Sequence, residues 1–254
     1  MSSKTVMITG ANRGIGKGLV AVYLADPNTT VVASVRDPAH STSQTLLDVP
    51  KAEGSKLVLI QITDVASSAA IQKGISVLKT EHGISALDIF IGNAGAAELS
   101  NQLTQTEPSE LQKFIDINAY GTLQLFKAVL PLLRASSGTG KFMYMSSAGG
   151  SLTTMQNVVP LSAYGASKAL GNYLVKWLSQ ENTDTVIWCQ HPGMVSSEMG
   201  AMGFKALLDQ GIDVMEHVIT VEKSTALMKQ VIDGATVEKT QGKFLGPDGE
   251  EIPW

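Results

Sequence analysis

Short apolar segments alternate along the chain with longer stretches of helical periodicity. Several apolar segments are hydrophobic at consecutive positions, which is typical of strands buried on both faces of a sheet. The pattern predicts strands at Thr5–Thr9, Thr30–Val35, Lys56–Ile62, Leu87–Gly92, Lys141–Ser146, Thr185–Gln190 and Gly242–Leu245. It predicts helices at Ile15–Ala25, Ala66–Glu81, Glu107–Leu133, Ser162–Glu181 and Thr220–Ile232. This alternation indicates an α/β fold with one doubly wound, mainly parallel sheet of about seven strands and helices on both faces.

The 254 residues contain no linker-like segment, so we expect a single domain over residues 1–254. Two segments are less regular. Pro131 lies near the end of the predicted helix Glu107–Leu133 and is expected to kink or shorten it. The segment Ser41–Gly54 is compatible with a short irregular helix. In open sheets of this kind ligands bind at the carboxyl ends of the strands, which are therefore the places to look for chemistry.

Composition and charge exclude several classes of protein. Hydrophobic residues make up 44% and charged residues 17%, which excludes a disordered chain and a coiled coil. The net charge of −4 predicts no nucleic-acid or anionic-membrane partner. The single cysteine, Cys189, and the scattered histidines predict neither a disulfide framework nor a metal site. The segment Met1–Lys4 leads into a strand without a signal-peptide core, and no apolar run reaches ~18 residues, so we expect a cytoplasmic protein.

A glycine-rich turn follows the first predicted strand. Its sequence, Gly10-Ala11-Asn12-Arg13-Gly14-Ile15-Gly16, matches neither the G-x-G-x-x-G turn of the common dinucleotide fold nor the G-x-x-x-x-G-K-[ST] phosphate loop. Glycines nevertheless allow a tight turn, and the start of the next helix offers free N–H groups to a pyrophosphate. The alternative is a turn that binds nothing. The candidate cofactor contacts here are Gly10, Asn12, Arg13, Gly14, Ile15 and Gly16.

The end of the second strand indicates which cofactor is bound. An acidic residue there would accept hydrogen bonds from the ribose hydroxyls of NAD(H), whereas an arginine accommodates the 2′-phosphate of NADP(H). Arg36 comes first and Asp37 follows, and Arg13 could approach the same phosphate. The order favours NADP(H), although solvated surface arginines would give the same pattern.

Tyr164 and Lys168 are four residues apart in a predicted helix and so lie on one face of it. Deprotonating a phenol at pH 7 costs roughly 4 kcal/mol. An ammonium about 5 Å away returns about 3 kcal/mol at an effective dielectric constant of ~20. The pair therefore suits general acid–base chemistry, although an exposed tyrosine beside a lysine is common on helices. Tyr120 and Tyr144 lack such a lysine.

The combination of motifs resembles the short-chain dehydrogenases/reductases over essentially the whole chain. The matching motifs are Thr9-Gly10-x3-Gly14-x-Gly16, Asp64-Val65, Asn93-Ala94-Gly95, Asn118, Ser147, Tyr164-x3-Lys168 and Pro192-Gly193-x-Val195. Within the family, the chain is similar to the carbonyl-reductase group, which includes C-factor-like proteins and fungal aromatic polyketide ketoreductases. Val35-Arg36-Asp37 and the C-terminal segment 248–254 carry this closer similarity.

The resemblance implies catalytic roles for four residues. Tyr164 would protonate the carbonyl oxygen during reduction, and Lys168 would lower the pKa of Tyr164 and hold the nicotinamide ribose. Ser147 would polarise the carbonyl, and Asn118 would position a water linking Lys168 to solvent.

The resemblance also implies cofactor contacts beyond the glycine turn. Asp64 would contact the adenine, Asn93 the adenosine ribose, and Val195 and Ser197 the carboxamide of the nicotinamide. The remaining implied contacts are Val65, Ala94, Gly95, Pro192 and Gly193.

The chain departs from the family between Ser147 and Tyr164, where the spacing of 17 residues is longer than usual. Both Ser146 and Ser147 therefore remain candidates, and the following Gly149-Gly150 favours Ser147. The extra residues are expected to border the substrate. A cap over about residues 194–220 is implied as well, although an ordinary packed helix would show the same pattern. The tentative substrate contacts are Met155, Met194, Met199, Met202 and Phe204.

These observations predict an NADPH-dependent ketoreductase that acts on a bulky, apolar or aromatic small-molecule carbonyl. One alternative is a catalytically silent NADP(H)-binding regulator or scaffold. Another is a methyltransferase with a glycine-rich first turn. The resemblance implies a homodimer or homotetramer, and monomers also occur in the carbonyl-reductase group.

Overall fold

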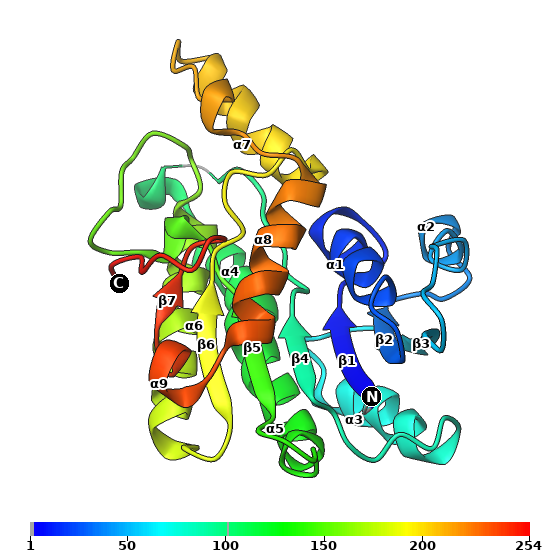
Figure 1. The fold of residues 1–254 in the computed structure, drawn as a ribbon. Helices are drawn as coiled ribbons and strands as arrows, with labels where there is room; N and C mark the ends of the chain where they lie inside the picture. The colour runs from blue at the N-terminus through cyan, green and yellow to red at the C-terminus, as the bar shows by residue number, and fades with distance from the viewer. Residues whose placement is uncertain (1–2, 101) are drawn as a thin grey trace.

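Seven parallel strands form one sheet in the computed structural model, which describes residues 3–100 and 102–254 (Figure 1). The strands are β1 Lys4–Thr9, β2 Thr29–Val35, β3 Lys56–Gln61, β4 Ile89–Gly92, β5 Lys141–Met145, β6 Val186–Gln190 and β7 Phe244–Leu245. Their order is β3-β2-β1-β4-β5-β6-β7, and each pair of neighbours is parallel. The direction of winding reverses between β1 and β4, which places a topological switch point at their carboxyl ends. The predicted fold class is confirmed, with all seven strands parallel.

Helices cover both faces of the sheet. They are α1 Gly14–Leu24, α2 Ser41–Gln44, α3 Ser68–Thr80, α4 Pro108–Ile115, α5 Gly121–Arg134, α6 Ser162–Glu181, α7 Glu198–Leu208, α8 Val221–Gly234 and α9 Val237–Thr240. Buried side chains of α3, α5 and α6 pack on one face, and those of α1 and α8 pack on the other. The apolar residues at consecutive strand positions are explained by these two helical layers, because each strand needs a buried side chain on both faces.

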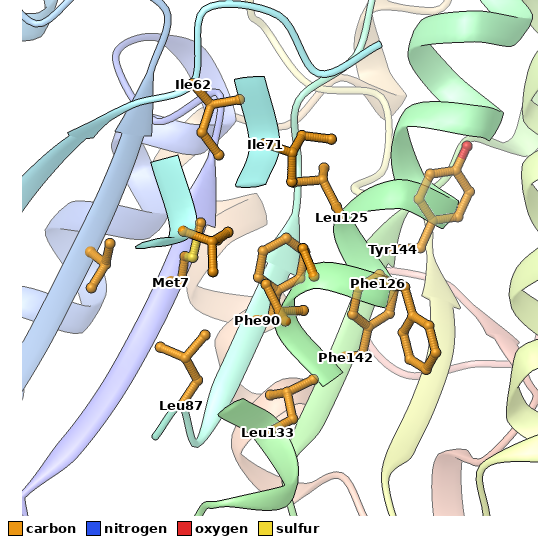
Figure 2. Close-up of a cluster of buried hydrophobic side chains, with 14 of the residues drawn as sticks. Met7, Ile62, Ile71, Leu87, Phe90, Leu125, Phe126, Leu133, Phe142 and Tyr144 are labelled. Carbon is orange, nitrogen blue, oxygen red and sulfur yellow. The ribbon is translucent and has the colours of Figure 1, made fainter. Parts of the chain in front are cut away.

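Aromatic rings dominate the core on the α3–α5–α6 face (Figure 2). Phe90 of β4 stacks on Phe142 of β5 with ring centroids 5.1 Å apart, and Phe126 of α5 meets Phe142 edge-on at 5.0 Å. Tyr144 lies two residues further along β5, on the same face and fully buried. The core therefore extends along β5 to the edge where ligands are expected.

The predicted helix Glu107–Leu133 is interrupted. α4 and α5 are separated by a π-turn at Asp116–Tyr120, which the periodicity of the sequence does not show. The Asn118 carbonyl in this turn accepts hydrogen bonds from Thr122 Oγ1 at 2.8 Å and Tyr144 Oη at 3.0 Å. Pro131 does not end α5, which continues to Arg134, because only the last helical turn follows the proline.

The described residues contain neither a membrane-spanning helix nor a cluster of metal-ligating side chains. No helix in residues 3–100 and 102–254 is both long and apolar enough to cross a membrane. In the same residues, no group of three or more histidine, cysteine, aspartate or glutamate side chains is arranged to hold a metal ion. The expectation that no signal peptide is present concerns the start of the chain, where Met1 and Ser2 lie outside the described residues.

Candidate active site

The glycine-rich turn between β1 and α1 packs closely against the end of β4. Gly10 has a φ of 62°, a left-handed conformation, and a Cβ there would lie 3.0 Å from the Ala94 Cα. At Gly16 a Cβ would overlap the Gly10 carbonyl group. No described side chain caps the N-terminus of α1, which begins at Gly14. The backbone N–H groups of this turn can therefore receive an anionic group such as a pyrophosphate.

The two arginines expected at a cofactor phosphate lie in different environments. Arg36 follows β2, is exposed, and has no ion-pair partner in the described part of the chain. Arg13 forms an exposed ion pair with Glu198, the first residue of α7, with Nη1 and Oε2 2.9 Å apart. Asp37 accepts a hydrogen bond from the Ala39 amide at 2.9 Å, so its carboxylate is already bonded within its own turn. Of these charges, the guanidinium of Arg36 is the one without an ion-pair or hydrogen-bond partner in the described residues.

Asn93 braces the end of β4 against the glycine turn. Its Nδ2 donates to the carbonyl oxygens of Thr9 at 2.9 Å and Gly10 at 3.1 Å. Thr9 Oγ1 in turn accepts from the Ala94 amide at 3.0 Å. Asn93, which is expected to contact the adenosine ribose, therefore also has a structural role that the sequence did not indicate.

The end of β3 lies beside the same region. Asp64 is exposed and accepts a hydrogen bond from the Ala66 amide at 2.8 Å. The Val65 carbonyl lies against the start of α5, where a Cβ at Gly121 would come within 2.7 Å of it. This contact fixes the position of Asp64 relative to the π-turn that carries Asn118.

Ser147, Tyr164 and Lys168 converge at the carboxyl end of β5. Ser147 follows that strand, and its Oγ accepts from the Gly149 amide at 3.2 Å. The Tyr164 side chain, in the first turn of α6, lies beside the Ser147 side chain, since a Cβ at Gly149 would lie 3.5 Å from Ser147 Oγ and 4.0 Å from Tyr164 Cε1. One turn later, Lys168 Nζ lies 5.8 Å from the centroid of the Tyr164 ring and donates to the Met145 carbonyl at 2.7 Å.

Ser146 takes a different role from its neighbour. Its side chain is buried and donates to Asn172 Oδ1 of α6 at 2.5 Å. Of the two candidate serines, the structure therefore places Ser147 beside the Tyr164 hydroxyl and uses Ser146 to hold β5 against α6.

Burial sets the pKa of both members of the tyrosine–lysine pair. It raises the pKa of Tyr164, which the hydrogen bond from Ser147 opposes, and it lowers the pKa of Lys168 to about 7. The expected lowering of the Tyr164 pKa by Lys168 is not seen. The physical reason is that Lys168 is itself desolvated and its Nζ is directed to the Met145 carbonyl and the Tyr144 ring.

Asn118 lies in the π-turn beside the lysine and is fully buried. Its side chain accepts from the Ala96 amide and donates to the Ala96 carbonyl and Ser167 Oγ, each at 2.9 Å. A Cβ at Gly95 would lie 3.0 Å from Asn118 Oδ1 and 3.5 Å from Lys168 Nζ. Glycine at position 95 therefore leaves open the space in front of these two side chains.

The segment after β6 supplies the other wall of the site. Gly193 has a φ of 87°, and Val195 forms a parallel bridge with Ile219. The Pro192 carbonyl accepts a hydrogen bond from α8 at 2.6 Å, and the Ser197 side chain caps α7. These contacts fix the backbone between β6 and α7 opposite the glycine turn.

The expected substrate cap contains α7, which projects beyond the carboxyl edge of the sheet (Figure 1). A hollow of about 470 Å³ lies between α7 and the segment that follows it, and its apolar lining includes Leu208 and Met215. Of the tentative substrate residues, Phe204 lines this hollow, whereas Met155, Met194, Met199 and Met202 do not. Met155 and Met199 are exposed, by 70% and 44%.

The long loop between Ser147 and Tyr164 is attached to the cap and to the C-terminal tail. Gln210, after α7, donates to the Val158 carbonyl at 2.8 Å. The Thr153 amide donates to the Trp254 carbonyl at 2.9 Å. The loop is thus held between the cap and the C-terminal tail, a role for the tail that the sequence did not reveal.

Two residues to which the sequence assigned no catalytic role lie against the site. Tyr144 places its ring under Lys168 Nζ, 4.7 Å from the ring centroid. His191 Nδ1 accepts from the Ala148 amide at 3.3 Å, and burial lowers the pKa of His191 to about 4. Their only signal in the sequence is that they lie near the carboxyl ends of the strands predicted at 141–146 and 185–190.

Comparisons with known proteins agree with this geometry. The family model described as short chain dehydrogenase matches residues 4–207. The chain is 50% identical to "Short chain dehydrogenase gsfK" of Penicillium aethiopicum over 253 residues, covering 98% of this chain and 99% of the relative. It is 33% identical to "Norsolorinic acid ketoreductase" of Aspergillus parasiticus, covering 98% and 90%.

A solved structure is similar over both entire chains. The NADPH-bound carbonyl reductase from chicken fatty liver superposes with a TM-score of 0.86 at 26% identity, with 100% of each chain covered. Together, the family model, the fungal relatives and this structure identify the protein as an oxidoreductase of the short-chain dehydrogenase family.

Proposed function

We propose that the protein is an NADPH-dependent ketoreductase that reduces a bulky, apolar or aromatic carbonyl compound. The observation that carries the proposal is the convergence of Ser147, Tyr164 and Lys168 at the strand edge beside the glycine-rich turn. Relatives named as norsolorinic acid ketoreductases support the reaction class and the type of substrate.

The charges around the adenosine end favour NADPH over NADH. Arg36 is exposed and unpaired in the described chain, so it can bind a 2′-phosphate. The neighbouring Asp37 is bonded to its own turn and is less available to accept hydrogen bonds from ribose hydroxyls. The glycine turn and the uncapped start of α1 fit the pyrophosphate.

When bound, the nicotinamide supplies the hydride. Ser147 and Tyr164 lie beside each other and would both face the carbonyl oxygen of the substrate. Because the pKa of Tyr164 is raised, its hydroxyl carries its proton at neutral pH, the form required to protonate a newly formed alkoxide. Lys168, buried one helical turn away, would hold the nicotinamide ribose through its Nζ.

The surroundings of the strand edge suit a large apolar substrate. Exposed hydrophobic side chains come from three segments that flank this edge. They are Leu99 and Leu103 after β4, Leu152 and Met155 in the long loop, and Met199 and Met215 in the cap. A small polar ketone would leave this surface uncovered, whereas a fused-ring aromatic would bury it.

The test is the loss of NADPH absorbance with ketones and quinones ranging from small aliphatic compounds to fused-ring aromatics, with NADH in parallel. We expect turnover of bulky aromatic ketones with NADPH, a loss of most activity in Tyr164→Phe, and a larger loss of NADPH than of NADH affinity in Arg36→Ala. Near wild-type turnover by a folded Tyr164→Phe protein would refute the mechanism. Thermal stabilisation by NADPH without turnover would favour the silent binder.

We further propose a homodimer or homotetramer that uses the exposed face of α6. Tyr173 and Trp177 stack on this face with ring centroids 6.0 Å apart, and both are more than half exposed. Sedimentation of the wild type and of Trp177→Lys tests this, and a wild-type monomer would refute it. The cytoplasmic location stays an expectation, to be tested by cell fractionation.

A further inference from the structure

Lys168 is a buried cation without a carboxylate partner. Its side chain is among the buried residues, and no aspartate or glutamate forms an ion pair with it in residues 3–100 and 102–254. Isolated buried ammonium groups are unfavourable unless other groups replace the lost hydration. The contacts that do so here are therefore informative about how the residue works.

Two contacts on β5 support the Lys168 ammonium. The Met145 carbonyl accepts from Nζ at 2.7 Å, and the ring of Tyr144 lies beneath Nζ at 4.7 Å from its centroid. An ammonium over the negative face of an aromatic ring is attracted to it, most strongly where water is excluded. The Tyr144 ring is fully buried and meets this condition.

Tyr144 is itself held in place from two sides. Its hydroxyl donates to the Asn118 carbonyl in the π-turn at 3.0 Å, and Figure 2 shows this hydroxyl directed away from Phe126 and Phe142. On α6, the absence of a side chain at Gly171 makes room for the phenol, because a Cβ there would lie 2.8 Å from Tyr144 Cζ. The ring therefore has little freedom to move away from Lys168.

The other groups that face Lys168 do not substitute for the ring. On β6, burial raises the pKa of Cys189, which leaves the thiol neutral. On α6, Tyr164 is also protonated at neutral pH, since its pKa is raised, and its ring is farther from Nζ than that of Tyr144, with the centroid at 5.8 Å. In the π-turn, Asn118 is uncharged. Burial lowers the pKa of Lys168 to about 7, so a modest change in its support alters its charge near neutral pH.

We propose that Tyr144 is a positioning residue whose ring holds Lys168 Nζ at the catalytic edge and keeps it protonated. The inference rests on the proposed reductase function and deepens it. A cation–π contact in a buried site is large enough to move the titration of Lys168 by about one pH unit. Tyr144 would thereby set the upper end of the pH range in which the enzyme reduces its substrate.

The test replaces Tyr144 with rings of the same shape and different electronics. Tyr144→Phe keeps the negative ring face, whereas pentafluorophenylalanine, introduced at position 144 by suppression, reverses it. The titration of Lys168 in the cofactor-free protein is followed by NMR of isotopically labelled lysine, with the signal assigned by its loss in Lys168→Met. We expect Lys168 of Tyr144→Phe to titrate within about 0.3 pH unit of Lys168 of the wild type. In the fluorinated protein, Lys168 should titrate about one pH unit lower.

The pH dependence of ketone reduction provides the second readout. Loss of the Lys168 proton ends the active range at high pH. The falling limb of the plot of kcat against pH should therefore move about one pH unit lower in the fluorinated protein, with little change in KM. The inference would be overturned if Lys168 titrated at the same pH in the two ring variants. It would also be overturned if the Lys168 titration shifted but the falling limb of the kcat profile did not. If the wild type reduces no ketone, the proposed function fails, while the NMR titration still decides whether the ring supports Lys168.

Discussion

Gly171 of α6 offers a direct test of how tightly the lysine support is packed. A Cβ at this position would overlap the Tyr144 hydroxyl oxygen and lie 2.8 Å from Cζ. Tyr144 cannot swing aside freely, because it is fully buried and bonded to the Asn118 carbonyl at 3.0 Å. Gly171→Ala must therefore push α6 away from β5 or break this hydrogen bond.

The cost follows from two opposing effects. Overpacking a close-packed core costs about 1–3 kcal/mol. Alanine gains about 0.5–1 kcal/mol over glycine inside a helix. The net loss is about 0–2.5 kcal/mol, with a middle value of about 1 kcal/mol, which corresponds to a fall in Tm of about 2–4 °C for a chain of this size.

Thermal unfolding followed by circular dichroism measures this loss. Gly234→Ala is the matched control, because Gly234 ends α8 and a Cβ there meets no atom within 4 Å. The double variant Gly171→Ala/Tyr144→Phe removes the oxygen that clashes, so its loss should be smaller than the sum of the two single losses. A Gly171→Ala protein as stable as Gly234→Ala would refute the packing that places Tyr144 under Lys168.

Three further predictions concern other parts of the site. Because the pKa of Lys168 is lowered to about 7 on folding, the unfolded state binds more protons above that pH, and the Tm of the cofactor-free protein should rise from pH 7 to about pH 9, above which the raised pKa of the buried Cys189 thiol acts in the opposite direction; Lys168→Met should remove the rise. His191→Leu removes the acceptor of the Ala148 amide and should cost about 1–3 kcal/mol by chemical denaturation, whereas His191→Asn, which can supply an acceptor, should cost less. Deleting Trp254 frees the Thr153 amide and should speed proteolysis of the loop and raise KM several-fold for bulky ketones; an unchanged cleavage rate would contradict the attachment.

The candidate site divides into residues that the sequence could identify and residues that it could not. The glycine turn and the Tyr164–Lys168 pair are short local patterns, and the structure places both at the carboxyl edge of the sheet. The sequence favoured Ser147 over Ser146 through Gly149-Gly150, and the structure adds the physical reason, because the packing of α6 on β5 buries Ser146 and leaves Ser147 beside Tyr164.

The sequence by itself determined the alternation of strands and helices, because each segment carries its own periodicity of apolar side chains. Tertiary structure alone decided the π-turn at Asn118 and the place of Tyr144 under Lys168, because both depend on contacts between segments far apart in the chain. It also decided the direction of the Tyr164 pKa. From the sequence, the charge of Lys168 dominates, whereas in the folded protein burial raises the pKa of Tyr164 and lowers the pKa of Lys168.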